Sequence, residues 1–173
     1  CNLDLLWVAS PNHLHLQHIK SGLEAGLKVF SEKPIVTTKE DSFSLAKLIQ
    51  KYGESQLIVG LVLRYSVHMR ELRRILDAGT LGNITSLEAN EHIAPFHGSF
   101  FMRDWRRLEK YSGGFMLEKC CHDIDLYNSI VGDRPSRVIS FGGRNNFIPS
   151  EAPPGDEHDD VYQIKKSYWE SAD

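Results

Sequence analysis

The sequence has few cysteines, no long apolar run and little net charge, and each of these absences excludes a class of protein. Three cysteines among 173 residues are too few for a disulfide framework, so a reducing cytoplasm is the expected compartment. No apolar run approaches the roughly 20 residues that a membrane-spanning helix needs, so no membrane partner is expected. A formal net charge of −3 offers no basic surface to nucleic acid.

The first third of the chain alternates short apolar runs with amphipathic segments. Three apolar runs predict strands: residues 3–9, 28–30 and 57–63. Between them, residues 14–23 and 43–49 have helical spacing; Thr38 is a candidate cap, and Gly26 and Gly53 are candidate stops. Strands separated by helices of about a dozen residues are typical of βαβ units with a parallel sheet. Such strands are normally covered on both faces.

The pattern changes after the third apolar run, and we place a domain boundary at residue 63. Ser66 is the predicted cap of the next helix. One longer helix is expected over residues 113–131, whereas residues 97–111 show no clean period. The other predicted elements are strands over residues 84–93 and 137–144 and an acidic, proline-rich mobile loop over residues 149–160.

Two motifs stand out, one on each side of this boundary. The run VASPNHLHLQHIKSGLEAGLKVFSEKPIVTT, residues 8–38, has Glu32-Lys33-Pro34 just after a short strand. The run GGFMLEKCCHDIDL, residues 113–126, carries a glycine pair, Glu118 and, four residues later, His122. Together and in this order they resemble the Gfo/Idh/MocA oxidoreductases, and the resemblance extends over residues 3–143.

This resemblance implies an α/β fold in two parts. Residues 1–63 would be the C-terminal part of a Rossmann parallel sheet, and residues 64–173 part of an α+β second domain with an open mixed sheet. It also implies NAD or NADP as cofactor, a sugar, cyclitol or related polyol as substrate, and a homo-oligomer. The alternative is a non-catalytic binding or regulatory protein on the same fold. Glu118 favours this alternative because the family usually has aspartate there, whereas Lys33 and His122 together favour the enzyme.

Lys33 and His122 are the candidate catalytic residues. Lys33 precedes a proline, which favours an extended conformation at a strand end, where active sites of open α/β sheets lie. An ammonium there can stabilise negative charge on a substrate oxygen. Histidine has an ordinary pKa of about 6.5 and can take a proton from an alcohol. Glu118 and His122, four apart on one predicted helix, would share a face. The alternative to a catalytic role is a solvated surface position for Lys33 and a packed core position for His122.

The resemblance also implies contacts to cofactor and substrate. The cofactor would lie beside Ser10, Pro11, Asn12, His15, Glu32 and Lys33, with Glu32 near the nicotinamide ribose. The substrate would contact Glu118, Arg64, Trp105 and Arg106. For Trp105 and Arg106 simple packing is the alternative, since an aromatic residue in a loop usually packs.

A metal site is not expected. Cys120 and Cys121 are adjacent on a predicted helix, so their side chains point about 100° apart and do not readily share one tetrahedral metal.

The sequence also lacks a strand–turn–helix glycine fingerprint for the pyrophosphate, and it begins with Cys1 rather than Met. We therefore expect a fragment whose phosphate-binding turn lies upstream. The residue that would distinguish NAD from NADP would lie upstream too. By itself this chain is expected to be inactive and prone to aggregate.

Overall fold

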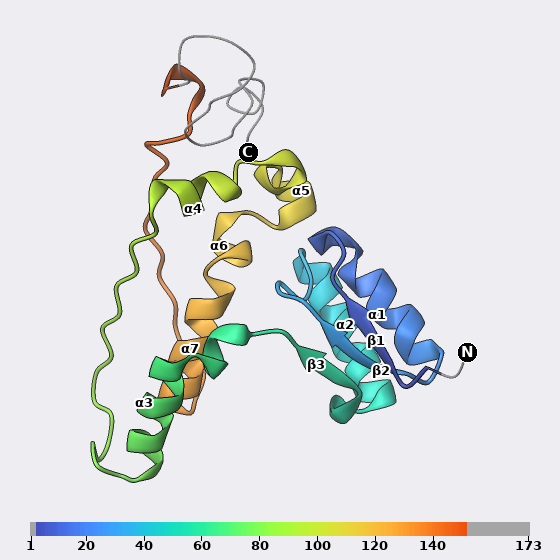
Figure 1. The fold of residues 1–173 in the computed structure, drawn as a ribbon, viewed down its shortest axis with the longest axis horizontal. Coiled ribbons are helices and arrows are strands. Elements are labelled where there is room, and N and C mark those ends of the chain that lie inside the picture. Colours follow the sequence, from blue (N-terminus) through green and yellow to red (C-terminus); the bar gives the residue numbers. More distant parts are fainter. Residues whose placement is uncertain (1–2, 152–173) are drawn as a thin grey trace. The chain divides into compact units, whose positions relative to one another are not determined.

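The computed structural model describes residues 3–151, which separate into two compact units (Figure 1). One unit, here called the sheet unit, comprises Cys1–Leu61 and Leu108–Cys121. The other, here called the helical unit, comprises Val62–Arg107 and His122–Asp173. Of the predicted loop at residues 149–160, only the turn Pro149–Glu151 is described, and the rest lies outside the described residues.

The sheet unit is built on three parallel strands in the order β1-β2-β3. The strands are β1 (Leu5–Val8), β2 (Lys28–Ser31) and β3 (Leu57–Val59). Leu6 pairs with Val29, and Val29 pairs with Leu57, so these three side chains lie in one row across the sheet. The predicted parallel sheet is confirmed, but the third strand does not extend over residues 57–63 as predicted, because β3 ends at Val59 and a 3-10 helix begins at Val62.

Helices α1 (His15–Glu24) and α2 (Lys39–Tyr52) pack their apolar sides on one face of this sheet. The core of the unit is formed by Val8, Ile19, Leu23, Val29, Val36 and Leu45. Thr38 caps α2, because its Oγ1 accepts a hydrogen bond of 3.1 Å from the backbone N–H of Asp41. Gly53 ends α2 at φ 97°, a backbone conformation that favours glycine. Both predicted helices are thereby confirmed.

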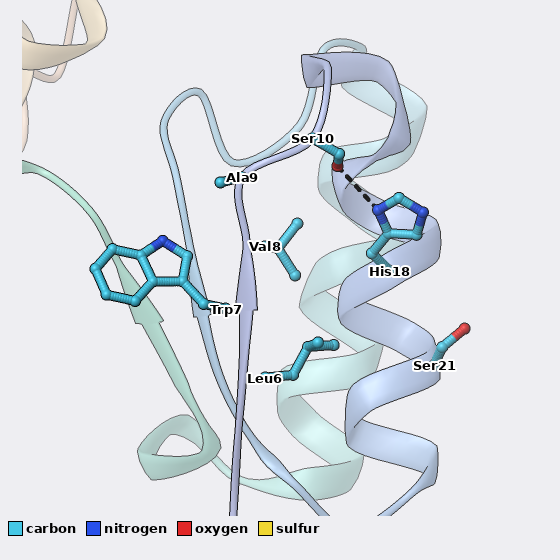
Figure 2. Close-up of a pocket in the computed structure, with 7 residues that line it drawn as sticks. All are labelled: Leu6, Trp7, Val8, Ala9, Ser10, His18 and Ser21. Atoms are coloured by element: carbon cyan, nitrogen blue, oxygen red, sulfur yellow. Dashed lines mark hydrogen bonds between the residues drawn. The ribbon is translucent and has the colours of Figure 1, made fainter.

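The opposite face of the sheet is open in the part of the chain that the structure describes. Leu6 and Val8 point toward α1, whereas Trp7 points to the other side (Figure 2). On that side Leu5, Trp7 and Ile58 are 49%, 62% and 50% exposed, and the Trp7 ring packs on Phe30 at 4.7 Å. The expectation of strands covered on both faces is therefore wrong for these residues.

The helical unit consists of short helices joined by extended coil (residues 62–107, green to yellow-green, and residues 122–151, orange, in Figure 1). Its main elements are η3 (Val62–Tyr65), α3 (Val67–Asp77), α4 (Pro95–Phe100), η4 (Asp104–Arg107) and α7 (Cys121–Val131). Ser66 caps α3 as predicted, accepting from the N–H of Met69 at 3.3 Å. The Arg73 side chain joins α3 to α7 by donating to the carbonyl and hydroxyl oxygens of Ser129.

Two predicted strands are not formed. Residues 84–93 and 137–144 are extended coil, as Figure 1 shows after α3 and after α7. A strand needs hydrogen bonds to a neighbouring strand, and neither segment has one among the described residues. The local sequence of each segment was therefore an incomplete signal.

The long helix predicted over residues 113–131 is also wrong. The structure has α6 (Phe115–Glu118) and α7 with a turn between them, preceded by α5 (Glu109–Ser112). Gly114 lies at φ 82° and ψ 166°, outside helical geometry. At the end of α6, the Glu118 carbonyl accepts a hydrogen bond from a side chain of another segment, which marks the interruption. Residues 97–111 overlap α4 and α5, which are too short to produce a period.

Candidate active site

Polar residues gather at the carboxyl ends of the three strands. The turn after β1 carries Ser10, the turn after β2 carries Glu32 and Lys33, and Gly60 follows β3. Glu32 N–H donates to the Val8 carbonyl at 2.9 Å, and Gly60 N–H donates to the Ser31 carbonyl at 2.8 Å. These bonds extend the parallel ladder one residue further and fix the turns beside one another.

Gly60 leaves space for the Glu32 carboxylate. A Cβ added at Gly60 would lie 3.2 Å from Glu32 Oε2 and 3.3 Å from two ring atoms of Phe30. Any larger residue would therefore displace the carboxylate or the ring. The absence of a side chain here keeps the Glu32 carboxylate at the strand end.

The turn after β1 is held from within by His15 and Asn12, which are 1% and 5% exposed. Both ring nitrogens of His15 lie 2.8 Å from backbone carbonyl oxygens, Nδ1 from that of Pro34 and Nε2 from that of Ser10. Asn12 Nδ2 donates to the Ser112 carbonyl at 3.1 Å. These two side chains, predicted to lie beside the cofactor, thus join three chain segments through backbone carbonyls.

Lys33 joins the second motif to the first. Its Nζ donates at 2.8 Å to the backbone carbonyl of Glu118, 85 residues away in the sequence. A lysine ammonium often binds carbonyls at the end of a helix, and Glu118 is the last residue of α6. The bond between Lys33 and Pro34 is a cis peptide.

Gly113 lets the second motif approach closely. It lies at φ 84°, and a Cβ there would meet the Thr37 carbonyl oxygen at 3.1 Å and a Leu117 methyl carbon at 2.4 Å. A side chain at this position would push Leu108–Cys121 away from the turn that follows Lys33. This is a physical reason for the glycine of the second motif.

Glu118 is 3% exposed, and its carbonyl rather than its carboxylate contacts Lys33. Because α6 ends at Glu118 and α7 begins at Cys121, Glu118 and His122 are not four apart on one continuous helix. The expectation that they share a helix face is wrong for this reason. Substrate binding by Glu118 stays a prediction.

In the helical unit, His122 lies in the first turn of α7 and is 9% exposed. Three residues later, Asp125 accepts two hydrogen bonds from Arg64 of η3, at 2.6 Å from Nε and 2.5 Å from Nη2. The hydrogen bond to Asp125 raises the pKa of Arg64 above its ordinary value. Arg64 was predicted to contact the substrate, whereas Asp125, which lies in the second motif three residues after His122, was given no role in the site.

Trp105 and Arg106 lie half-buried in η4. The Arg106 guanidinium is 4.4 Å from the centre of the Trp105 ring and 4.3 Å from that of Phe100. These are cation–π distances, so the two residues take part in local packing. Substrate contact by either stays a prediction.

A hollow lies beside α1 along β1, which is an edge strand of the sheet in the described residues (Figure 2). Its lining residues are Leu6, Trp7, Val8, Ala9, Ser10, His18 and Ser21. Ser10 Oγ and His18 Nδ1 are hydrogen-bonded at 2.9 Å, but none of the lining residues is a carboxylate that would orient the imidazole. The pair therefore ties α1 to the turn after β1 and lacks the third group of a nucleophilic triad.

Neither a metal centre nor a membrane helix is found within residues 3–151. No group of three or more His, Cys, Asp or Glu residues there could hold a metal ion. Cys121 Sγ instead lies 3.5 Å from the Glu118 carbonyl, and Cys120 Sγ lies 3.7 Å from Met116 Sδ. None of the helices in this range combines the length and apolarity needed to cross a bilayer.

Three parallel strands, helices between them and polar side chains at their carboxyl ends define a Rossmann-type nucleotide-binding unit. Residues 2–61 match the model of an oxidoreductase family with an NAD-binding Rossmann fold, and residues 69–164 match the GFO/IDH/MocA C-terminal domain. The chain belongs to the Gfo/Idh/MocA oxidoreductase family.

Relatives of known name agree with this assignment. The chain is 32% identical, over 90% of its length and 36% of the relative's, to YteT of Bacillus subtilis strain 168, which is named as an oxidoreductase. The crystal structure of myo-inositol 2-dehydrogenase from Lactobacillus plantarum is similar with a TM-score of 0.61 and 28% identity, over 76% of this chain and 38% of that one. Scyllo-inositol dehydrogenase from Lactobacillus casei, solved with NAD(H) and scyllo-inositol, has a TM-score of 0.60 and 30% identity over the same shares. The chain thus spans less than half the length of these proteins.

Proposed function

We propose that the full-length protein is an NAD(P)-dependent dehydrogenase that transfers hydride between nicotinamide and a sugar, cyclitol or related polyol. The observation that carries this proposal is the position of Lys33. Lys33 follows the carboxyl end of β2 and is joined to the second motif through the Glu118 carbonyl. The chain that carries it belongs to a family with an NAD-binding fold. The inositol dehydrogenases with similar structures support the substrate class.

The residues at the strand ends fit a nicotinamide cofactor. Glu32 offers a carboxylate, the natural acceptor for ribose hydroxyls, and Gly60 beside it leaves room for that carboxylate at the strand end. Ser10 and Pro11 form the neighbouring turn, where Leu14 N–H donates to the Pro11 carbonyl at 2.9 Å. A bound nicotinamide supplies the hydride acceptor, and the chain supplies binding and orientation.

Lys33 would bind the reacting oxygen of the substrate. Its ammonium has three N–H donors, and the Glu118 carbonyl takes one of them. The remaining donors can hold a substrate hydroxyl and stabilise the negative charge that grows on its oxygen as the proton leaves. The bond to Glu118 restricts the lysine to one orientation, which reduces the entropy lost when substrate binds.

His122 would act as the general base. It takes the hydroxyl proton while the hydrogen on the same carbon leaves as hydride, so the alcohol becomes a carbonyl. Its place in α7 is set within the helical unit by the ion pair of Arg64 and Asp125, one turn further along. Arg64 therefore acts on this site through Asp125 in our proposal.

A panel of inositols, sugars and linear polyols with NAD and with NADP tests this proposal in the full-length protein, with formation of reduced cofactor measured by absorbance. We expect reduction with at least one cyclic polyol, and its loss in Lys33→Met. Binding of cofactor and polyol without reduction in any combination would instead support the non-catalytic alternative.

Light scattering of the same protein tests the homo-oligomer implied by the resemblance.

A further inference from the structure

We propose that His15 is a positioning residue for Lys33, and that its ring does not bind the cofactor directly. This inference rests on the proposed function, because Lys33 is the group whose placement matters. His15 is the first residue of α1 and is 1% exposed, so its ring is enclosed by protein. The two carbonyls at its ring nitrogens belong to Ser10 and Pro34, which lie in the turns after β1 and β2.

Carbonyl oxygens only accept, so a neutral His15 ring donates to one of the two turns through its single N–H, and the ring donates to both turns only as an imidazolium. Both contacts measure 2.8 Å, a length typical of a well-formed hydrogen bond. Pro34 directly follows Lys33, so a bond to the Pro34 carbonyl acts on the backbone next to the catalytic candidate. With both ring nitrogens facing backbone carbonyls, the ring has no polar atom left to offer to a ligand.

Other contacts in the sheet unit converge on the same turn. Lys33 Nζ is held by the Glu118 carbonyl, and Asn12 binds the Ser112 carbonyl in the same segment, Leu108–Cys121. His15 thus fixes the backbone of the lysine turn, while Glu118 fixes the far end of the lysine side chain. Loss of His15 removes the support on the backbone side and leaves the support at the ammonium.

The sequence offers a matched control in His18, on the same helix. His18 also contacts Ser10, through Ser10 Oγ at 2.9 Å, but no contact joins it to the turn of Lys33 in the described residues. Removing His18 therefore loosens α1 from the turn after β1 and leaves the bond to Pro34 in place. If losing a contact between α1 and the turn after β1 were enough to lower kcat, kcat would fall in both variants. If the positioning of Lys33 is what matters, kcat falls only in the His15 variant.

The test uses the full-length protein with His15→Leu, His15→Gln and the control His18→Leu. Misplacement of a catalytic group by about 1 Å costs on the order of 100-fold in rate, so we expect kcat to fall by about 10- to 100-fold in His15→Leu. KM and cofactor affinity should change by less than about threefold, because the groups that would bind them are retained. His15→Gln keeps a donor for one carbonyl and should recover part of the lost kcat, and His18→Leu should stay within about twofold.

Two further measurements separate positioning from loss of structure. In a Lys33→Met background, His15→Leu should lower kcat little further, because two residues acting through one group are not additive. After reductive methylation with ¹³C-formaldehyde, the NMR resonance of Lys33 should shift in His15→Leu, while that of exposed Lys47 should not. If His15→Leu does not fold, His15→Gln decides by the same readouts.

An unchanged kcat and Lys33 resonance in the folded His15 variants would overturn the inference, as would equal losses in His15→Leu and His18→Leu. Full additivity with Lys33→Met would overturn it as well. If the wild type reduces no cofactor with any polyol, the proposed function fails. A Lys33 resonance that still moves in His15→Leu would then show that the positioning itself is correct.

Discussion

Lys33 and His122 carry the chemistry in our proposal, so their removal gives the most direct prediction at the residue scale. Lys33→Met and His122→Ala should each lower kcat by about 10²- to 10⁴-fold, the usual contribution of general acid–base groups. Cofactor affinity should change little in His122→Ala, since His122 belongs to α7 and is not one of the residues in the turns after β1 and β2 that would hold the nucleotide. Steady-state kinetics and cofactor titration measure both effects. Near-normal turnover in either variant would remove that residue from the mechanism.

The ion pair between Arg64 and Asp125 makes a second prediction. Its side chains are 48% and 13% exposed, so solvent screening limits its contribution to stability to about 1 kcal/mol or less. Arg64→Met should therefore leave the urea midpoint nearly unchanged, yet lower kcat by about tenfold because the first turns of α7 lose an anchor.

Arg74→Met is the matched control, because Arg74 forms a comparable exposed pair with Glu71 on α3, with an Nη2–Oε1 distance of 2.7 Å. The hydrogen bond from Arg74 lowers the pKa of Glu71, so the two side chains interact. Removing Arg74 therefore breaks an exposed ion pair, as removing Arg64 does. Equal kcat losses in Arg64→Met and Arg74→Met would contradict an anchoring role for Arg64 and Asp125.

At the scale of the element, α1 and the sheet meet at Gly22. A Cβ there would lie 2.8 Å from Leu6 Cδ2 and 2.8 Å from Val29 Cγ2, and Val29 is fully buried. Glycine to alanine in a helix normally gains roughly 1 kcal/mol, but forcing atoms into a packed core costs about 1–3 kcal/mol. We therefore expect Gly22→Ala to lower the free energy of unfolding.

Urea denaturation measures this change, with exposed Ser21→Ala in the same helix turn as control. Ser21→Ala should alter stability by less than about 0.5 kcal/mol, the usual range for surface sites. A Gly22→Ala variant more stable than the wild type would show that α1 packs farther from β1 and β2 than the structure has it.

At the scale of the whole molecule, the open face of the sheet has the largest consequence. Exposed apolar patches on a sheet promote association, and Trp7 is 62% exposed beside Phe30. The chain of residues 1–173 by itself should therefore self-associate at micromolar concentrations, and Trp7→Lys should reduce light scattering strongly. Phe43→Lys, at a residue 60% exposed on α2, should reduce it much less. Equal effects of the two substitutions would mean that the open face is not the associating surface.

The sequence by itself determined the local elements and the two motifs. Apolar runs and caps such as Thr38 and Ser66 act within a few residues, so the three strands, α1, α2 and α3 could be predicted from nearest neighbours. The family resemblance was likewise carried by contiguous stretches, and the match of both domain models confirms it.

Only the tertiary structure decided which residues from distant parts of the sequence come into contact. Lys33 meets the Glu118 carbonyl across 85 residues, and Arg64 meets Asp125 across 61. No local pattern predicts such pairs. Every residue has the same backbone carbonyl, so the sequence does not mark which carbonyl accepts, and the partners of an ion pair have no fixed spacing along the chain. The strands predicted over residues 84–93 and 137–144 failed for the same reason, since a strand exists only with a hydrogen-bonded neighbour, and the residues of one segment do not supply that neighbour.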